Sequence, residues 1–210
     1  MTVNTYPYAG KTVLVTGAGS GIGKAIAKGF ADNGANLVVL GRRADAIAGT
    51  IADVPAERAL AIAADLTDRS QVTDAVAQIV ERFGRLDVVV ANAAAYTSGE
   101  LTDADNETFR RVFATNVDGL YYLVTASIEH LIASGGNVVA ISSVSGIAGD
   151  WGQSVYNSSK HAVNGMIRSL ALDYGDRGVR FNIVSTAFTL TEMTEHMAED
   201  QAALAPFVNR

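Results

Sequence analysis

Six short and almost uniformly apolar runs are spaced along the chain, and longer stretches with helical periodicity separate them. The runs are TVLVT at 12–16, NLVVL at 36–40, ALAIA at 59–63, DVVVA at 87–91, NVVAIS at 137–142 and VRFNIV at 179–184. Runs without polar alternation are typical of strands buried on both faces of a parallel sheet. The helical stretches are 21–33, 44–53, 70–83, 103–134 and 155–174. This order predicts an α/β fold with a doubly wound parallel sheet and right-handed crossovers.

The ends of several helices carry their own signals. Ser70 and Asp103 precede helical stretches and are expected to be N-terminal caps. Gly34, Gly84 and Gly135 follow helical stretches, where a residue in the left-handed conformation often ends a helix.

The composition excludes several classes of protein. The chain is 49% hydrophobic and 18% charged, which argues against disorder, and its 210 residues contain no linker, repeat or low-complexity tract. We therefore expect a single domain over residues 1–210. The net charge of −6 disfavours binding to nucleic acid or to an anionic membrane. The absence of cysteine rules out disulfides and thiolate metal sites, and the three histidines are too far apart to suggest a metal site.

The N-terminal segment has no basic stretch followed by an apolar run, and no apolar stretch is long enough to cross a bilayer. We therefore expect a cytoplasmic protein without a membrane partner.

A glycine-rich loop, Thr16-Gly17-Ala18-Gly19-Ser20-Gly21-Ile22-Gly23, joins the first run to the first helical stretch. Its spacing is T-G-x-x-x-G-x-G, formed by Gly17, Gly21 and Gly23, and the spacing G-x-G-x-x-G does not fit. Glycines permit a tight turn and let the backbone approach a pyrophosphate, while the helix N-terminus offers free N–H groups. The loop predicts a dinucleotide site; the alternative is a turn that binds nothing.

Further along the chain come Asn92, Asn116, Ser143 and the pair Tyr156 and Lys160, in that order. Together with the glycine loop, this series resembles the short-chain dehydrogenases/reductases, and the resemblance covers nearly the whole chain. It implies a Rossmann-type domain that interconverts an alcohol and a ketone or aldehyde with a nicotinamide cofactor. It also implies a small-molecule alcohol or ketone as substrate and a homo-oligomeric assembly.

The resemblance assigns Tyr156 as the general acid/base and Lys160 as its helper, which also holds the nicotinamide ribose. Their spacing places both on one helix face, and a nearby ammonium is expected to lower the pKa of the tyrosine. The alternative is a surface pair without chemistry. Ser143, thirteen residues before Tyr156, is implied to bind the substrate oxygen, with Ser142 as the rival candidate. Asn116 is implied to perturb its helix and to hold a water that connects to Lys160.

The end of the second run bears on the choice of cofactor. Gly41 stands where an acid would accept the ribose 2′-hydroxyl of NAD, and Arg42 and Arg43 follow. Arginine suits the 2′-phosphate of NADP, so we expect NADP(H), with Arg42 as the main contact and Arg43 as a secondary one; NAD is the alternative. The other cofactor contacts that the resemblance implies, besides the three glycines, are Ser20, Ile22, Asp65, Leu66, Asn92, Tyr156, Lys160, Thr189 and Thr191. Asp65 has an alternative role as a turn or cap residue.

The chain also departs from the family pattern. Ala91-Asn92-Ala93-Ala94 stands where the family has Asn-Asn-Ala-Gly, and Thr186-Ala187 replaces Pro-Gly. The sequence ends where the family continues into a further helix, a last strand and a C-terminal tail, so we expect a shortened member or a fragment with an exposed sixth strand. Loops that line the substrate pocket in the family carry Tyr96, Trp151, Phe188 and Met193, for which packing is the alternative role.

Two other functions stay open on the sequence. One is reduction of a 3-oxoacyl group linked to a carrier, which would favour a basic docking patch. The other is a nucleotide-binding protein without turnover, or an inactive truncated fragment.

Overall fold

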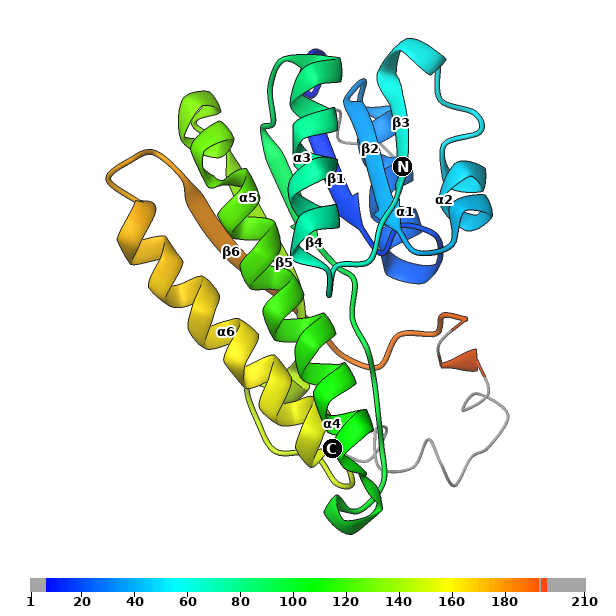
Figure 1. Cartoon of the computed structure of the whole chain (residues 1–210), viewed down its shortest axis with the longest axis vertical. Coiled ribbons are helices and arrows are strands. Elements are labelled where there is room, and N and C mark those ends of the chain that lie inside the picture. Colours follow the sequence, from blue (N-terminus) through cyan, green and yellow to red (C-terminus); the bar gives the residue numbers. More distant parts are fainter. Residues whose placement is uncertain (1–6, 193, 196–210) are drawn as a thin grey trace, which may run out of the picture.

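The computed structural model describes residues 7–192 and 194–195, and its centre is a six-stranded sheet (Figure 1). The strands are β1 (Thr12–Thr16), β2 (Asn36–Gly41), β3 (Ala59–Ala63), β4 (Val88–Ala91), β5 (Asn137–Ser143) and β6 (Arg180–Thr186). Their order in the sheet is β3-β2-β1-β4-β5-β6, and every neighbouring pair is parallel. The chain reverses its direction of winding between β1 and β4, so the crevice at the carboxyl ends of these two strands is where such a sheet binds its ligand.

Helices cover both faces of the sheet, which confirms the doubly wound α/β prediction (Figure 1). They are α1 (Gly21–Asp32), α2 (Ala44–Thr50), α3 (Arg69–Phe83), α4 (Asn106–Phe113), α5 (Gly119–Ser134) and α6 (Ser154–Tyr174). The core around α3, α5 and α6 includes Leu14 and Val38, whereas the core around α1 and α2 includes Val13 and Val39. Adjacent strand residues thus enter opposite cores, which is why these runs contain almost no polar residue.

The helical stretch predicted over 103–134 is helical from Asn106 to Ser134, so only its start is wrong. A 3-10 turn occupies Leu101–Asp103, and α4 is followed by a π-helical turn at Ala114–Asp118 before α5 begins. Such single π-turns are rare and are frequently found at functional sites. Asn116, a residue whose amide competes with helical hydrogen bonds, lies at the centre of this turn.

Both predicted caps are also wrong, by two residues each. Asp68 caps α3, because its carboxylate accepts hydrogen bonds from the backbone N–H of Ser70 and Gln71. Asp105 caps α4 in the same way and accepts from the backbone N–H of Thr108 at 2.7 Å. The three glycines expected to end helices do have positive φ: Gly34, Gly84 and Gly135.

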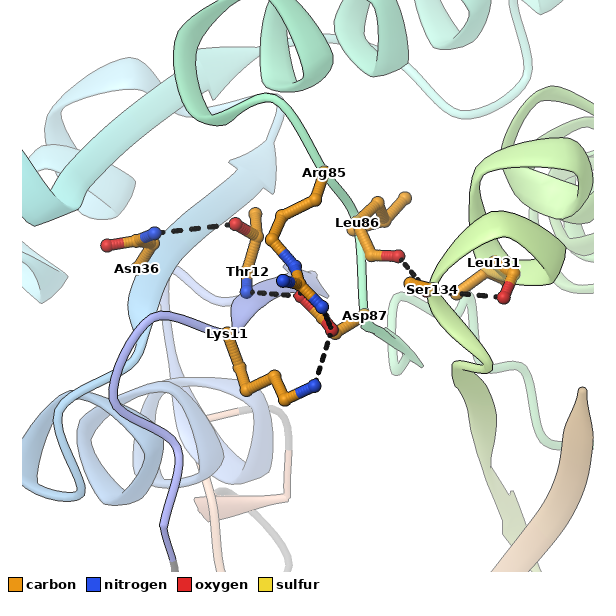
Figure 2. A network of polar contacts seen from close by, with 8 residues as sticks. All are labelled: Lys11, Thr12, Asn36, Arg85, Leu86, Asp87, Leu131 and Ser134. Carbon is orange, nitrogen blue, oxygen red and sulfur yellow. Dashed lines mark hydrogen bonds and ion pairs between the residues drawn. The ribbon is translucent and has the colours of Figure 1, made fainter.

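A polar network joins the amino ends of β1 and β4, which are the strand ends opposite the crevice (Figure 2). The carboxylate of Asp87 accepts from Arg85 Nε at 2.8 Å, Lys11 Nζ at 3.1 Å and the backbone N–H of Thr12 at 2.9 Å. Burial by itself would raise the pKa of Asp87, but the hydrogen bonds from Arg85, Thr12 and Lys11 hold it below its ordinary value. The network secures the register of two central strands.

Within the described residues, β6 pairs on one side only, with β5. In the same part of the chain, no helix is both long and apolar enough to span a bilayer.

Candidate active site

Tyr156 and Lys160 lie in the first turns of α6, beside the carboxyl end of β5. The Lys160 ammonium is 5.7 Å from the centroid of the Tyr156 ring. Lys160 is only 4% exposed, and its Nζ donates a hydrogen bond to the carbonyl oxygen of Ile141 at 3.0 Å. A lysine is almost never buried to this degree without a function or a partner. The pair is therefore not the surface pair that the spacing alone allowed.

The pKa values of the two residues move in opposite directions. Burial lowers the pKa of Lys160 to about 8. Burial also raises the pKa of Tyr156, electrostatic interactions with Tyr96 and Asp150 add to that effect, and a hydrogen bond with Ser143 opposes it. The net pKa of Tyr156 is therefore raised rather than lowered, because burial outweighs the hydrogen bond with Ser143.

Ser143, rather than Ser142, is the serine next to Tyr156. Ser143 ends β5, and its hydroxyl lies within hydrogen-bonding reach of the Tyr156 hydroxyl. Ser142 points to the other side of the strand, where its hydroxyl is buried and has no hydrogen-bond partner among the described residues. It packs against Gly146, whose missing side chain leaves the space.

The π-turn presents the Asn116 side chain to two neighbouring segments. Its Oδ1 accepts from the backbone N–H of Ala95 at 2.7 Å, and its Nδ2 donates to the carbonyl of Ala95 at 3.0 Å and to Ser159 Oγ at 2.9 Å. Ser159, which we did not predict, is fully buried and links the turn to α6 next to Lys160. A cavity of about 20 Å³ borders Thr115, Asn116, Ile141 and Lys160. This volume is sufficient for one water molecule.

The glycine loop forms a cradle that has no room for side chains. A Cβ on Gly17 would lie 2.8 Å from Ala93 Cα, and a Cβ on Gly23 would lie 2.4 Å from Asn92 Nδ2. Ser20 is the N-cap of α1, but its side chain forms no capping hydrogen bond, so the first N–H groups of the helix remain available to an anion. The loop therefore fits a pyrophosphate. The side chain of Ile22 packs against the core.

Asn92 holds this loop against the end of β4. Its Nδ2 donates to the carbonyl oxygens of Thr16 at 3.0 Å and Gly17 at 3.2 Å. Thr16 completes the link, because its hydroxyl accepts from the backbone N–H of Asn92 at 3.0 Å and of Ala93 at 3.2 Å. We did not predict a role for Thr16; its signal was a polar residue at the end of an apolar strand. No residue other than glycine has a positive φ in the described segments, so Ala94 fits without backbone strain.

A groove of about 560 Å³ lies at the carboxyl ends of β2 and β3, where the adenosine end of a dinucleotide would follow the cradle. Its lining residues are Arg42, Asp65, Thr67, Asn106, Glu107, Arg110, Arg111, Ala114 and Thr115. Arg42 is exposed in this groove. Arg43 instead lies near Glu192, with 3.9 Å between Arg43 Nη2 and Glu192 Oε2. Asp65 forms a turn, because its Oδ1 accepts from the backbone N–H and the hydroxyl of Thr67, both at 2.9 Å. The side chain of Leu66 lies in the core.

The segment after β6 returns to the glycine loop. Thr191 packs on Gly21, where an added Cβ would lie 3.0 Å from Thr191 Cγ2. The Thr189 hydroxyl instead donates to the carbonyl of Ala187 at 3.1 Å, within its own loop. Thr191 therefore lies against the cradle, and Thr189 supports the loop.

The residues considered for the substrate pocket differ in their surroundings. The ring of Tyr96 packs edge-on against Tyr156, with 5.0 Å between the centroids. Trp151 is 89% exposed and packs on nothing that would bury it. Met193 lies outside the described residues.

This sheet order, the glycine cradle at the switch point and a Tyr–Lys pair beside it define a dinucleotide-binding α/β enzyme. The sequence model of the short chain dehydrogenase family matches residues 11–202, and the chain belongs to that family, whose members are NAD(P)-dependent oxidoreductases.

Three known proteins illustrate the similarity. The chain is 35% identical to a meso-2,3-butanediol dehydrogenase of Serratia marcescens, covering 88% of this chain and 73% of that protein. It is 36% identical to an L-rhamnose 1-dehydrogenase (NAD(P)(+)) of a Sphingomonas strain, covering 91% of this chain and 78% of the other. A 3-ketoacyl-(acyl-carrier-protein) reductase of Brucella melitensis, solved with NADH, superposes with a TM-score of 0.86 at 27% identity and covers 90% of this chain and 80% of its own.

Proposed function

We propose that the chain interconverts a small alcohol, or a hydroxyl of a sugar-like molecule, and the corresponding carbonyl compound with NADP(H). The observation that carries this proposal is the group formed by half-buried Tyr156 with buried Ser143 and Lys160 beside the glycine cradle. The names of two relatives, a butanediol dehydrogenase and a rhamnose dehydrogenase, support the substrate class.

In this proposal Tyr156 gives a proton to the substrate oxygen during reduction and takes it back during oxidation. Ser143 holds the same oxygen within reach of the tyrosine. Lys160 lies one helical turn after Tyr156 on α6. The hydrogen bond from Asn116 to Ser159 holds Asn116 in the wall of the small cavity that also borders Lys160. The bound nicotinamide would supply the hydride, and the protein supplies position and the proton.

The cofactor would lie along the crevice from the cradle to the groove. Gly17, Ser20, Gly21, Ile22 and Gly23 would hold the pyrophosphate through backbone N–H groups.

The adenosine half would lie beside Asn92, with Asp65 and Leu66 in the loop around the adenine. Thr189 and Thr191 would border the nicotinamide end. These contacts follow from the family pattern and from the positions described above.

NADP rather than NAD is proposed because no carboxylate ends β2. Gly41 is its last residue, and Arg42 is exposed in the groove that follows. Arg43 is a secondary contact, since Glu192 already lies near its guanidinium. Fluorescence titration of NADPH and NADH with wild type and Arg42→Ala tests this. We expect NADPH affinity to fall roughly 10-fold or more, as for the loss of a charge-assisted hydrogen bond, with little change for NADH. A wild-type preference for NADH would contradict the assignment.

Turnover is tested by following NADPH absorbance with a panel of ketones, sugars and diols. Tyr156→Phe keeps the ring and removes only the hydroxyl, so we expect it to reduce kcat at least about 100-fold without weakening NADPH binding. Equal rates in the two proteins, or cofactor binding without turnover of any compound, would reject the proposal.

The structural similarity to a 3-ketoacyl reductase favours one second candidate, the reduction of a 3-oxoacyl thioester. Including such a thioester in the panel separates the two, because a carrier-linked activity would give it a much higher kcat/KM than any free ketone.

A further inference from the structure

Helix α2 lies close to two segments that border the proposed cofactor crevice. A Cβ on Gly19, in the glycine loop, would lie 3.0 Å from the Cβ of Ala46 on α2. A Cβ on Gly41, the last residue of β2, would lie 3.0 Å from Ile47 Cγ2 on the same helix. The helix therefore contacts both the glycine loop and the strand end that precedes Arg42.

Thr50, the last residue of α2, forms a hydrogen bond with the glycine loop. Its hydroxyl donates to the carbonyl oxygen of Ala18 at 2.8 Å and shares its proton with the carbonyl oxygen of Ala46 at 3.1 Å. Thr50 is 3% exposed and Ala18 is fully buried, so water does not compete for the bond between them. Among the described residues, no other group donates to the Ala18 carbonyl. Thr50 thus supplies the partner that this buried carbonyl needs.

The bond from Thr50 also determines the direction of the next backbone N–H group. The carbonyl of Ala18 and the N–H of Gly19 belong to one peptide unit, and the described segments contain no cis peptide bond. In a trans unit the carbonyl and the N–H point in opposite directions. Because the carbonyl is held on α2, the Gly19 N–H points away from that helix, and no described residue accepts its hydrogen bond. This N–H is therefore available to a ligand oxygen.

We propose that Thr50 positions the glycine loop for the cofactor, because it holds the Ala18 carbonyl so that the Gly19 N–H donates to a phosphate or ribose oxygen of the bound dinucleotide. Thr50 is a positioning residue, since it acts on the cofactor through the loop. The inference rests on the proposed function in one respect, that the cofactor lies over this loop. NADPH and NADH share the pyrophosphate and the ribose, so Thr50 should affect both, whereas Arg42 should affect NADPH.

The first test is fluorescence titration of NADPH and NADH with Thr50→Val, which keeps the branched shape and removes the hydroxyl. We expect both dissociation constants to rise roughly 3- to 10-fold, as for the loss of one hydrogen bond. Thr50→Ser keeps the hydroxyl and should bind both cofactors as the wild type does. Thr73→Val is the matched control and should change neither constant. Thr73 is exposed on α3, and its hydroxyl donates to the carbonyl of Arg69 at 2.9 Å, within its own helix.

The melting temperature of each variant separates positioning from simple packing. A threonine that only supports packing would lower the melting temperature when it is replaced and would leave the affinity unchanged. Unchanged dissociation constants in Thr50→Val would therefore overturn the inference, whatever the melting temperature shows. Equal weakening in Thr50→Ser would also overturn it, because the hydroxyl would not be the cause. A loss confined to NADPH would contradict it as well, because the effect would then belong to the 2′-phosphate.

The second test uses the wild type and does not depend on whether a variant folds. Amide hydrogen exchange is followed by NMR without cofactor and with saturating NADPH. We expect the Gly19 N–H to exchange at least about 10-fold more slowly in the complex, because a hydrogen bond to the cofactor protects it. Equal exchange in the two states would overturn the inference. A wild type that binds neither cofactor would reject the proposed function and this inference together, whereas intact binding without turnover would reject the proposed function alone.

Discussion

At the scale of single residues, the site combines two titratable groups whose burial acts on them in opposite directions. Burial favours the neutral form of each, so it raises the pKa of Tyr156 and lowers that of Lys160 to about 8. A half-buried tyrosine that keeps its proton at neutral pH is a suitable acid for carbonyl reduction. The oxidation direction needs the deprotonated form, and its rate should increase with pH.

Lys160 should destabilise the fold that it serves. Below pH 8 its ammonium is buried and charged, so Lys160→Met is expected to raise the free energy of unfolding at pH 7 by about 1–3 kcal/mol while it reduces turnover. The folded pKa of about 8 lies below the ordinary 10.5, so the wild type gains stability as pH rises between these values and the difference should shrink. Urea denaturation at pH 7 and pH 10 measures both effects. Lys28→Met, an exposed substitution on α1, is the control, and a difference that does not depend on pH would contradict the explanation.

At the scale of secondary-structure elements, the active site depends on how helices begin and how one of them is interrupted. The N-terminus of α1 has no side-chain cap, which leaves its N–H groups for an anion, while α3 and α4 are capped by aspartates. The π-turn between α4 and α5 directs one amide side chain to both the loop after β4 and α6. Each element departs from the ordinary helix at the point where it borders the site.

Gly23→Ala tests the close packing of α1 against the cradle. The new Cβ would lie 2.5 Å from the carbonyl oxygen of Gly17, so the loop must shift, and we expect a loss of about 1–3 kcal/mol in stability together with weaker NADPH binding. Thermal denaturation and fluorescence titration measure the two effects. Gly29→Ala in the same helix meets no atom within 4 Å and should stabilise the protein by up to about 1 kcal/mol without changing affinity. Equal behaviour of the two variants would show that the cradle does not need this contact.

At the scale of the whole molecule, the two ends of the strands differ in the contacts they carry. The carboxyl ends carry the glycine cradle, Ser143 and the loops that follow the strands. The amino ends carry the Asp87 network, which joins β1 to β4 at the end of the strands away from the site (Figure 2). Stability and catalysis should therefore respond to different substitutions.

Asp87→Ala is expected to destabilise the fold by about 2–4 kcal/mol, because it leaves the buried N–H of Thr12 without an acceptor. Asp87→Asn keeps an acceptor oxygen and should lose less, and kcat should be unchanged in both. The carboxylate pKa is lowered, so its contribution is complete above about pH 4 and is lost as pH falls through the folded value. Denaturation from pH 7 to pH 3 measures this. Glu129→Gln, at an ion pair where Glu129 is 73% exposed, is the control and should change stability by less than about 0.5 kcal/mol. A large drop in kcat for Asp87→Asn would contradict the separation of stability at the amino ends from catalysis at the carboxyl ends.

Local patterns alone determined the sheet, the glycine cradle and the placement of Tyr156 and Lys160 on one helix face. These features follow from periodicity and spacing within a few residues of one another, which is why the predicted strands agree with the observed ones to within two residues. The caps at Asp68 and Asp105 were predictable in principle, since the correct aspartate lies two residues away from each residue that we chose.

Only the tertiary structure decided the rest. The hydrogen-bond partners of Asn116, the burial of Lys160 and the direction of the Tyr156 pKa shift all depend on segments far apart in the sequence. Thr16 meets Asn92, Asn116 meets Ser159, and Ile141 meets Lys160 only after the sheet and α6 have packed. Burial and hydrogen-bond direction are properties of that packed arrangement, and spacing along the chain does not encode them.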